Sequence, residues 1–403
     1  MKYVIIIPDG CADDQLDVLQ GRTPLQAAHL PNMDAIAKRG VVGRANNVPQ
    51  PLTPASDVAT LSLFGYDPLA VYTGRAPLET VAMGIPLGPR DWAIRCNLVH
   101  IKDNRMHDFT AGHIHSADGA RIMATIQQSL GGPTPQGLLE FHAGVQYRNI
   151  LVVRDPGEQS PFDATTKTQP PHDIPDQPIA GHLPTGTGSE LLRDLMARSV
   201  SICADHLANR ERIARGDKPA TQIWLWGQGR APSVVPFAQL HGKRGAIISA
   251  VDLVRGTGML IGWQRIDAPG ATGYLDTDYA SKGRTAIAAL RDFDVVCVHI
   301  EAPDEASHEG RADAKVDALE NIDKLIVGPV LEELQKSDSW RILVSPDHRT
   351  TIKSRAHSYG KVPFAVAGTG IQSHGQLSYD EFVAEKSHLD FDQGWRLMKW
   401  FIG

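Results

Sequence analysis

The sequence predicts an α/β protein whose core is a doubly wound sheet, with an α+β domain inserted into it. Apolar runs at residues 3–7, 294–300 and 340–344 are typical of short buried strands, and each leads into a proline followed by an aspartate. Strand-like and helix-like segments alternate around these runs. Active sites of open α/β sheets lie at the carboxyl ends of the strands, so we expect the functional residues there.

The first quarter of the chain predicts a strand followed by three helices. Residues 3–7 are followed by Asp9, and Thr23 with Pro24 gives a helix-start signal that leads toward residues 35–40. Prolines between residues 49 and 54 predict an extended segment before a helix whose first turn includes Ser56 or Asp57. Residues 73–79 then read as a tight loop that begins another helix.

The residue composition of the sequence changes beyond about residue 90. Residues 91–222 hold eight of the 16 histidines and a proline-rich run at 168–175. Strand and helix alternation resumes at residue 223, with a buried-strand candidate at 246–251 and an amphipathic helix over 315–336. We therefore predict a discontinuous core domain formed by residues 1–90 and 223–403. Residues 91–222 would form the inserted, substrate-binding domain.

Composition argues for an ordinary soluble protein. The 403 residues carry a formal net charge of −6, without the basic excess typical of nucleic-acid binding. No stretch reaches membrane-spanning length, and the apolar run at the N-terminus is too short for a signal peptide. The four cysteines are far apart and lack metal-binding spacing, so we expect neither a disulfide nor a cysteine zinc site. A cytoplasmic location is the expectation.

Residues 345–357 combine the side chains that a divalent metal ion prefers. Asp347 and His348 follow a predicted strand, and His357 lies a few residues later among cations. Carboxylate and imidazole ligands suit Mn, Zn or Mg. Asp304 and His308, four residues apart, would share one face of a helix and could reach the same ion. The alternatives are a solvated loop with incidental histidines and, for Asp304, an acidic helix start.

Ser56 is the candidate nucleophile. At the start of a helix its hydroxyl lies at the positive end of the helix dipole, which favours a bound phosphate and an ionised oxygen. The alternative is that Ser56 only caps the helix, the commoner role of a serine at this position.

Eight short motifs are spread over nearly the whole chain: residues 54–59 (PASDVA), 63–68 (LFGYDP), 72–79 (YTGRAPLE), 95–99 (RCNLV), 111–114 (AGHI), 141–148 (FHAGVQYR), 224–229 (WLWGQG) and 269–274 (PGATGY). With these motifs the chain resembles the archaeal-type cofactor-independent phosphoglycerate mutases of the alkaline phosphatase superfamily. Two positions depart from the family pattern. Members usually carry glycine where this chain has Ala55 and asparagine where it has Thr60, and both positions flank the nucleophile.

The resemblance implies an alkaline-phosphatase-like core that holds two divalent ions. One ion would be bound by Asp304, His308 and His357, and the other by Asp9, Ser56, Asp347 and His348. Manganese is the favoured metal, and Zn, Co or Mg would also suit the ligands. The implied reaction interconverts 3-phosphoglycerate and 2-phosphoglycerate through a phosphoserine, without 2,3-bisphosphoglycerate. The inserted domain would close the site and exclude water.

Substrate phosphate and carboxylate require cations, which arginine and lysine supply in different geometries. By motif position we predict this role for Arg95, Arg148, Lys282 and Arg355, and a general acid or base role for His113. For each of these the alternative is a surface salt bridge or a satisfied histidine.

Three other functions stay open at this stage. The first is a homoserine kinase-like phosphotransferase on the same scaffold, and the second is a metal-dependent phosphatase. The third is a non-catalytic metal-binding protein, which the complete ligand set and Ser56 argue against. The sequence gives no indication of oligomeric state.

Overall fold

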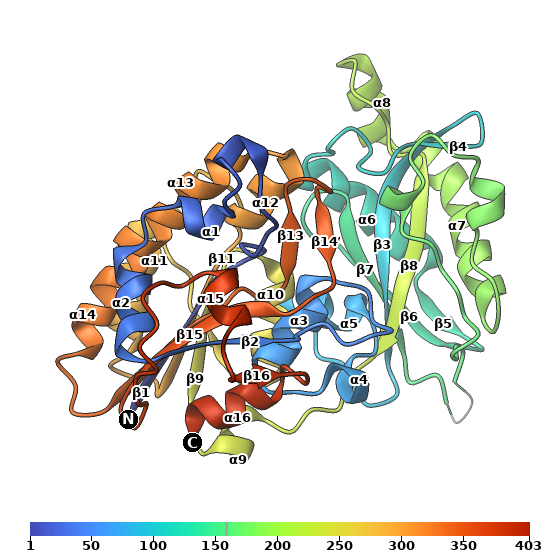
Figure 1. The fold of residues 1–403 in the computed structure, drawn as a ribbon. Coiled ribbons are helices and arrows are strands. Elements are labelled where there is room, and N and C mark those ends of the chain that lie inside the picture. Colours follow the sequence, from blue (N-terminus) through green and yellow to red (C-terminus); the bar gives the residue numbers. More distant parts are fainter. Residues whose placement is uncertain (158–159) are drawn as a thin grey trace. The chain divides into compact units, whose positions relative to one another are not determined.

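The computed structural model describes residues 1–157 and 160–403, and the chain forms two compact units. Residues 1–72 and 234–403 make up the first unit, and residues 73–233 the second (Figure 1). The predicted boundaries, after residues 90 and 222, fall inside the second unit instead. The helix α5 (Arg75–Ala82) and the strand β8 (Gln222–Arg230) explain the difference, because both pack on the strand β3 (Trp92–Lys102).

An eight-stranded sheet forms the centre of the first unit. Its spatial order is β10 (Gln264–Arg265), β9 (Gly245–Ile248), β11 (Val295–Ile300), β1 (Lys2–Pro8), β12 (Trp340–Val344), β15 (Val362–Gly368), β2 (Val41–Ala45) and β16 (Asp390–Phe391). Strand β1 pairs in parallel with both β11 and β12. The three runs that precede a proline and an aspartate are therefore adjacent and end at the same edge.

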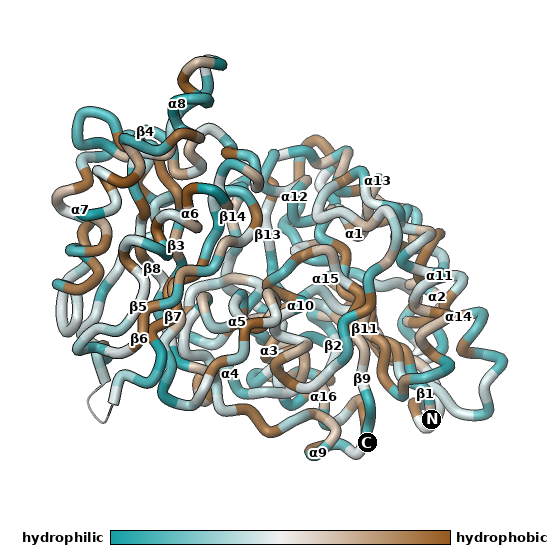
Figure 2. The backbone as a smooth tube through the Cα atoms, turned by 180° about the vertical axis from the view of Figure 1, so that it is seen from behind, coloured by the Kyte–Doolittle hydropathy of each residue, from teal (hydrophilic) through white to brown (hydrophobic). Residues whose placement is uncertain are grey.

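Helices cover both faces of this sheet, which confirms the predicted doubly wound α/β core. Alternate residues of β1 point to opposite faces, with Val4 and Ile6 in one apolar cluster and Ile5 and Ile7 in the other. The central strands are accordingly apolar along their length, as the colouring around β11 in Figure 2 shows. The first cluster is covered by α2 (Pro31–Arg39), α11 (Tyr279–Ala289), α13 (Ala312–Ile322), η4 (Asp323–Val327) and α14 (Gly328–Leu334). The second is covered by α3 (Ser56–Leu63), α9 (Phe237–His241), α10 (Asp252–Leu260) and α16 (Arg396–Ile402).

The remaining elements of the first unit are short. They are η1 (Asp17–Leu19), α1 (Pro24–Ala27), α4 (Pro68–Val71), α12 (Ala302–Glu309), the hairpin β13 (Arg349–Thr351) and β14 (Ala356–Ser358), and α15 (Glu381–Glu385). Thr23 caps α1 as predicted, but the helix breaks before Pro31, so residues 24–39 form two helices rather than one. The predicted helix over 315–336 is likewise interrupted, by the π-helical turn η4. Pro329 follows this turn and cannot donate a helical main-chain hydrogen bond.

The second unit is built on a sheet of its own. The strands run in the order β4 (Arg105–Asp108), β3, β7 (Arg148–Arg154), β6 (Gly137–His142) and β5 (Gly132–Thr134), and β8 pairs with β3. Its helices are α5, α6 (Ser116–Leu130), η2 (Pro171–Asp173), η3 (Ile179–His182), α7 (Ser189–Asp205) and α8 (Leu207–Ala214). Among the described residues of the whole chain, no helix has both the length and the apolar character needed to cross a bilayer.

Candidate active site

The predicted metal ligands of the first unit meet at the carboxyl edge of its sheet. Asp9 directly follows β1, and Asp347 and His348 follow β12. Asp304 and His308 lie on α12, which begins just after β11 ends. His357 lies on β14, which turns back from the Asp347 segment through the hairpin. Parallel pairing of three strands therefore brings together residues as far apart in the sequence as Asp9 and His357, which are 348 positions apart.

Asp304, His308 and His357 form one compact group. Oδ2 of Asp304 lies 2.9 Å from Nε2 of His308 and 3.5 Å from Nε2 of His357. The Nδ1 atoms of these histidines face main-chain oxygens of Arg355 at 2.9 Å and Pro54 at 3.2 Å. A carbonyl only accepts hydrogen bonds, so each Nδ1 carries its proton and each Nε2 is directed toward the shared centre.

The charges of this first group are strongly coupled. Burial alone would raise the pKa of Asp304, but hydrogen bonds from His308 and His357 bring it well below the usual value. The hydrogen bond to Asp304 raises the pKa of His308 to about 9. In the absence of a metal, a proton on His308 therefore supplies positive charge at the point where a cation would lie.

Asp9, Asp347 and His348 form a second, fully buried group. Nε2 of His348 lies 3.5 Å from Oδ1 of Asp9 and 3.5 Å from Oδ2 of Asp347. Both of these carboxylate oxygens are buried without a hydrogen-bond partner among the described residues. Burial, followed by the charge of Asp347, raises the pKa of Asp9 well above the usual value. Buried oxygens of this kind are costly unless a cation binds them, so the donor set fits a divalent ion.

Ser56 lies beside the second group. It is the first residue of α3, and its Oγ is 3.1 Å from Nε2 of His348. Ala55, not Ser56, occupies the N-cap position, so the helix-capping alternative does not describe this serine. Ala55 has an extended backbone with a φ of −167°, which any residue adopts, and alanine therefore fits where glycine is usual.

Comparison with known proteins identifies the family. A family model described as 2,3-bisphosphoglycerate-independent phosphoglycerate mutase matches residues 37–209. A protein of that name from Methanothrix thermoacetophila is 46% identical over 403 residues, which is 100% of both chains. One from Methanothermobacter thermautotrophicus is 45% identical over 99% of this chain and 96% of its own. The chain belongs to the 2,3-bisphosphoglycerate-independent phosphoglycerate mutases.

Solved structures agree with this family fold. A protein from Pyrococcus horikoshii superposes with a TM-score of 0.83 at 26% identity, covering 100% of this chain and 96% of the other. A cofactor-independent phosphoglycerate mutase from Thermoplasma acidophilum, 24% identical, superposes with a TM-score of 0.69 over 100% of both chains. Membership of the mutase family makes the protein an isomerase, an intramolecular phosphotransferase that uses divalent metal and requires no bisphosphoglycerate.

His299 is a site residue of this mutase that the sequence did not predict. It lies on β11, fully buried, and its Nε2 is 2.6 Å from Oδ2 of Asp9. Its Nδ1 is 3.1 Å from Oγ of Ser249. When Asp9 is ionised, as a metal ligand is, it only accepts, and Nε2 of His299 then carries the proton and donates it to Asp9. His299 therefore orients Asp9. Its only sequence signal is an imidazole within an otherwise apolar strand.

Glu301 adds a further carboxylate beside His299. Its Oε2 lies 3.5 Å from Nε2 of His299 and has no hydrogen-bond partner among the described residues. Burial, together with the charge of Asp304, raises the pKa of Glu301 to about 8. Below pH 8 the Glu301 carboxyl is therefore mostly protonated, so it adds a buried hydrogen-bonding group rather than further negative charge at this edge of the sheet.

Two of the residues predicted to bind substrate, Arg95 and Arg148, lie in the second unit with a third guanidinium, Arg75. The charges of Arg75 and Arg148 both act on Arg95, and burial lowers the pKa of Arg95 to about 10. Arg95 pairs with Glu79 at 2.8 Å and stacks over the ring of Trp226 at 4.1 Å. Glu79 also accepts a hydrogen bond from Arg75. Arg75 and Arg95 share one carboxylate, and the charge of Arg148 also acts on Arg95, so positive charge exceeds negative charge around Arg95.

The other predicted side chains do not join that cluster. Lys282 is fully buried in the first unit, where its Nζ donates to the main-chain oxygen of His299 at 3.0 Å. Arg355 has an exposed side chain, and its main-chain oxygen holds His308. His113 is exposed on the second unit with a positive φ of 49°. Their predicted roles toward substrate stay predictions.

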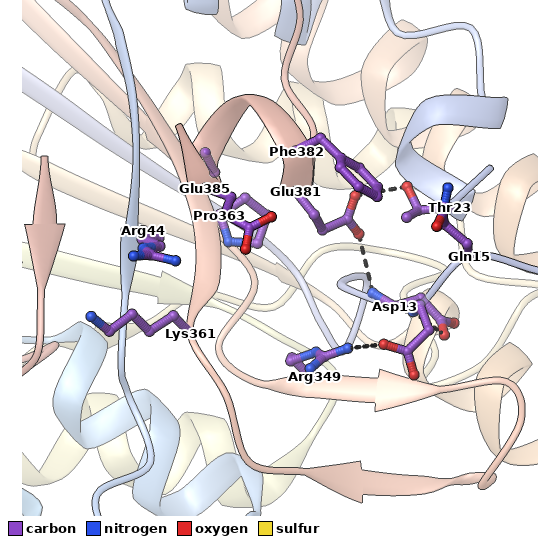
Figure 3. Close-up of a pocket in the computed structure, with 12 residues that line it drawn as sticks. Asp13, Gln15, Thr23, Arg44, Arg349, Lys361, Pro363, Glu381, Phe382 and Glu385 are labelled. Carbon is purple, nitrogen blue, oxygen red and sulfur yellow. Dashed lines mark hydrogen bonds and ion pairs between the residues drawn. The ribbon is translucent and has the colours of Figure 1, made fainter. Parts of the chain in front are cut away.

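A cavity of about 590 Å³ lies beside the segment that follows β12 (Figure 3). Its described lining includes Arg349, the neighbour of His348, but none of the predicted ligands. Figure 3 shows Glu381 joining two segments of its wall: it accepts hydrogen bonds from the main-chain N–H of Asp13 at 3.1 Å and from the hydroxyl of Thr23 at 2.7 Å. The described lining holds cations and carboxylates, and the hydrogen bonds of Glu381 fix the segment around Asp13 next to Thr23.

Proposed function

We propose that this protein interconverts 3-phosphoglycerate and 2-phosphoglycerate through a covalent phosphoserine at Ser56. The observation that carries the proposal is the position of Ser56, whose hydroxyl lies 3.1 Å from Nε2 of His348. The same Nε2 lies 3.5 Å from buried oxygens of Asp9 and Asp347 that have no hydrogen-bond partner among the described residues. Membership of the mutase family, with near-complete coverage of both chains, supports the substrate. We further propose that the protein acts in the cytoplasm.

We propose that the site holds two divalent ions, most suitably Mn. Asp304, His308 and His357 would hold one of them. Asp9, Ser56, Asp347 and His348 would hold the other. When bound, the ions would lower the pKa of the Ser56 hydroxyl and neutralise charge on the transferring phosphoryl group.

In the forward direction, Oγ of Ser56 attacks the phosphorus and loses its proton. The bond between phosphorus and the oxygen on carbon 3 breaks, and that oxygen takes up a proton to give free glycerate. Glycerate turns, and the oxygen on carbon 2 attacks the phosphoserine, loses its proton and restores the Ser56 hydroxyl. The position of Ser56 at the first turn of α3 directs main-chain N–H groups toward the phosphoryl oxygens.

We propose that the second unit supplies cations for the substrate carboxylate and phosphate. Arg95 and Arg148 are the predicted residues, and the structure adds Arg75 beside them. Glu79 and Trp226 hold the buried Arg95 guanidinium in a fixed orientation. We keep His113 as the proposed acid or base for the turning glycerate.

The test is 2-phosphoglycerate formation from 3-phosphoglycerate by metal-free protein resupplied with Mn, without 2,3-bisphosphoglycerate. Ser56→Ala should abolish turnover. Ser62→Ala is the matched control, because Ser62 is also a buried serine of α3 but belongs to no ligand group. Turnover should survive in this control. If the wild type releases inorganic phosphate or consumes ATP with homoserine instead, the mutase proposal is refuted. Unchanged turnover in Ser56→Ala would refute the nucleophile.

A further inference from the structure

The hydroxyl of Thr350 contacts two proposed ligands that belong to different ions. Oγ1 of Thr350 is hydrogen-bonded to Oδ1 of Asp304, and it lies 3.1 Å from Nδ1 of His348. Thr350 is fully buried on β13. In the proposed function Asp304 holds one ion and His348 the other. The hydroxyl of Thr350 therefore connects the two ligand groups through hydrogen bonds.

The direction of each hydrogen bond follows from the number of protons available. A carboxylate ligand only accepts, so the single hydroxyl proton of Thr350 goes to Asp304. The contact with His348 then requires that Nδ1 of the imidazole donate to the threonine oxygen. Nε2 of His348 is left with its lone pair, and this atom faces Ser56, Asp9 and Asp347.

We propose that Thr350 is a positioning residue that prepares both metal sites at once. It selects the tautomer of His348 that can bind an ion, and it holds Oδ1 of Asp304 so that Oδ2 faces His308 and His357. This inference rests on the proposed function, and it adds a residue that the ligand pattern does not contain. Its chemistry matches the general dependence of metal affinity on groups that orient the ligands.

The surroundings of Thr350 fix the position of its main chain. Nζ of the fully buried Lys315 donates to the main-chain oxygen of Thr350 at 2.8 Å and to Oδ2 of Asp13 at 2.8 Å. Asp13 in turn accepts from the main-chain N–H of Ile352 at 3.1 Å. Asp13 also lines the cavity of Figure 3, where its main chain is held by Glu381. Because the main chain of Thr350 is fixed, its hydroxyl stays within reach of Asp304 and His348.

Gly10 leaves the space that this arrangement needs. A Cβ atom at Gly10 would lie 2.4 Å from Oδ1 of Asp304 and 2.6 Å from Oγ1 of Thr350. Any larger residue would push apart the two atoms that form the hydrogen bond. The loop after β1 thus contributes a ligand, Asp9, and next to it the gap that accommodates Thr350.

The experiment measures Mn binding rather than turnover. Metal-free wild type, Thr350→Val and Thr350→Ser are compared by equilibrium dialysis with metal analysis. Valine keeps the shape of threonine and removes the hydroxyl, so both sites should lose roughly tenfold or more in affinity. Serine restores the hydroxyl and should restore both affinities. Thr351→Val is the matched control, because the hydroxyl of Thr351 contacts only Ser354 among described residues; its affinities should equal those of the wild type.

Two outcomes would overturn the inference: unchanged Mn affinities in Thr350→Val, or a loss confined to one of the two ions. A wild type that takes up fewer than two ions would instead refute the proposed function. If Thr350→Val fails to fold, ¹⁵N-histidine NMR of the metal-free wild type decides. With His348 assigned through His348→Gln, its neutral ring should be protonated at Nδ1, and protonation at Nε2 would overturn the inference.

Discussion

Replacing His299 by leucine should weaken Mn binding while the fold is retained. His299 is fully buried and neutral, since burial lowers its pKa to about 3. Leucine fills a similar volume inside β11 and preserves the apolar packing of the strand. The change therefore removes mainly the hydrogen bond from Nε2 to Oδ2 of Asp9, which spans 2.6 Å.

The magnitude follows from that one bond. A hydrogen bond to a charged group contributes about 1.5–3 kcal/mol. At about 1.4 kcal/mol per factor of ten, its loss corresponds to a roughly 10- to 100-fold lower affinity for the ion held by Asp9. Measurements on other metal sites give the same range of about 10- to 100-fold for lost orienting groups. Binding of the ion proposed for Asp304, His308 and His357 should be affected much less.

The assay is Mn binding to metal-free protein by calorimetry, with circular dichroism to check the fold. His241→Leu is the matched control, because this half-buried histidine of α9 packs on Phe237 away from the ligand groups. Equal affinities of His299→Leu and wild type at both sites would refute the reasoning. An equal loss of Mn affinity in His241→Leu would show that the effect comes from disturbed packing and not from the lost hydrogen bond.

Two further predictions follow from the same site. Gly10→Ala should impair binding of both ions, because its Cβ would collide with Asp304 and Thr350 and because a φ of +59° is strained for alanine. Equilibrium dialysis with Mn measures this, and an affinity equal to that of the wild type would contradict the prediction. Mn affinity should rise with pH up to about 9, because His308 is protonated below its raised pKa of about 9 and must lose this proton to bind the ion. For one displaced proton, the affinity should rise by at most about tenfold per pH unit. In the metal-free protein, the raised pKa of His308 stabilises the folded state. This contribution is fully present below about pH 6.5, the ordinary pKa of histidine, and it is lost as the pH rises through about 9. Proton release on adding Mn, followed with an indicator dye, should be observed at pH 8, and its absence would contradict this assignment.

Local patterns were sufficient to predict the main parts of the core. The apolar runs at β1, β11 and β12 and the prolines that follow them are short-range signals, and parallel pairing then places their ends together. The start of α3 at Ser56 was predicted for the same reason. The boundaries of the inserted unit were placed differently, because strand patterns do not state which sheet a strand joins. Strand β8 joins the second sheet through β3.

The sequence by itself determined the class of fold, the strand ends and the residue types that suit a two-metal site. Only the tertiary structure decided how these residues are oriented. The proton on His357 is placed by the main-chain oxygen of Pro54, which lies 303 residues away, and Asp9 is oriented by His299, 290 residues away. Neither partner has a local signature, since a carbonyl exists at every residue and a buried histidine reads as part of a strand. Propensity acts over a few neighbours, whereas the direction of a hydrogen bond depends on what folding brings within about 3 Å.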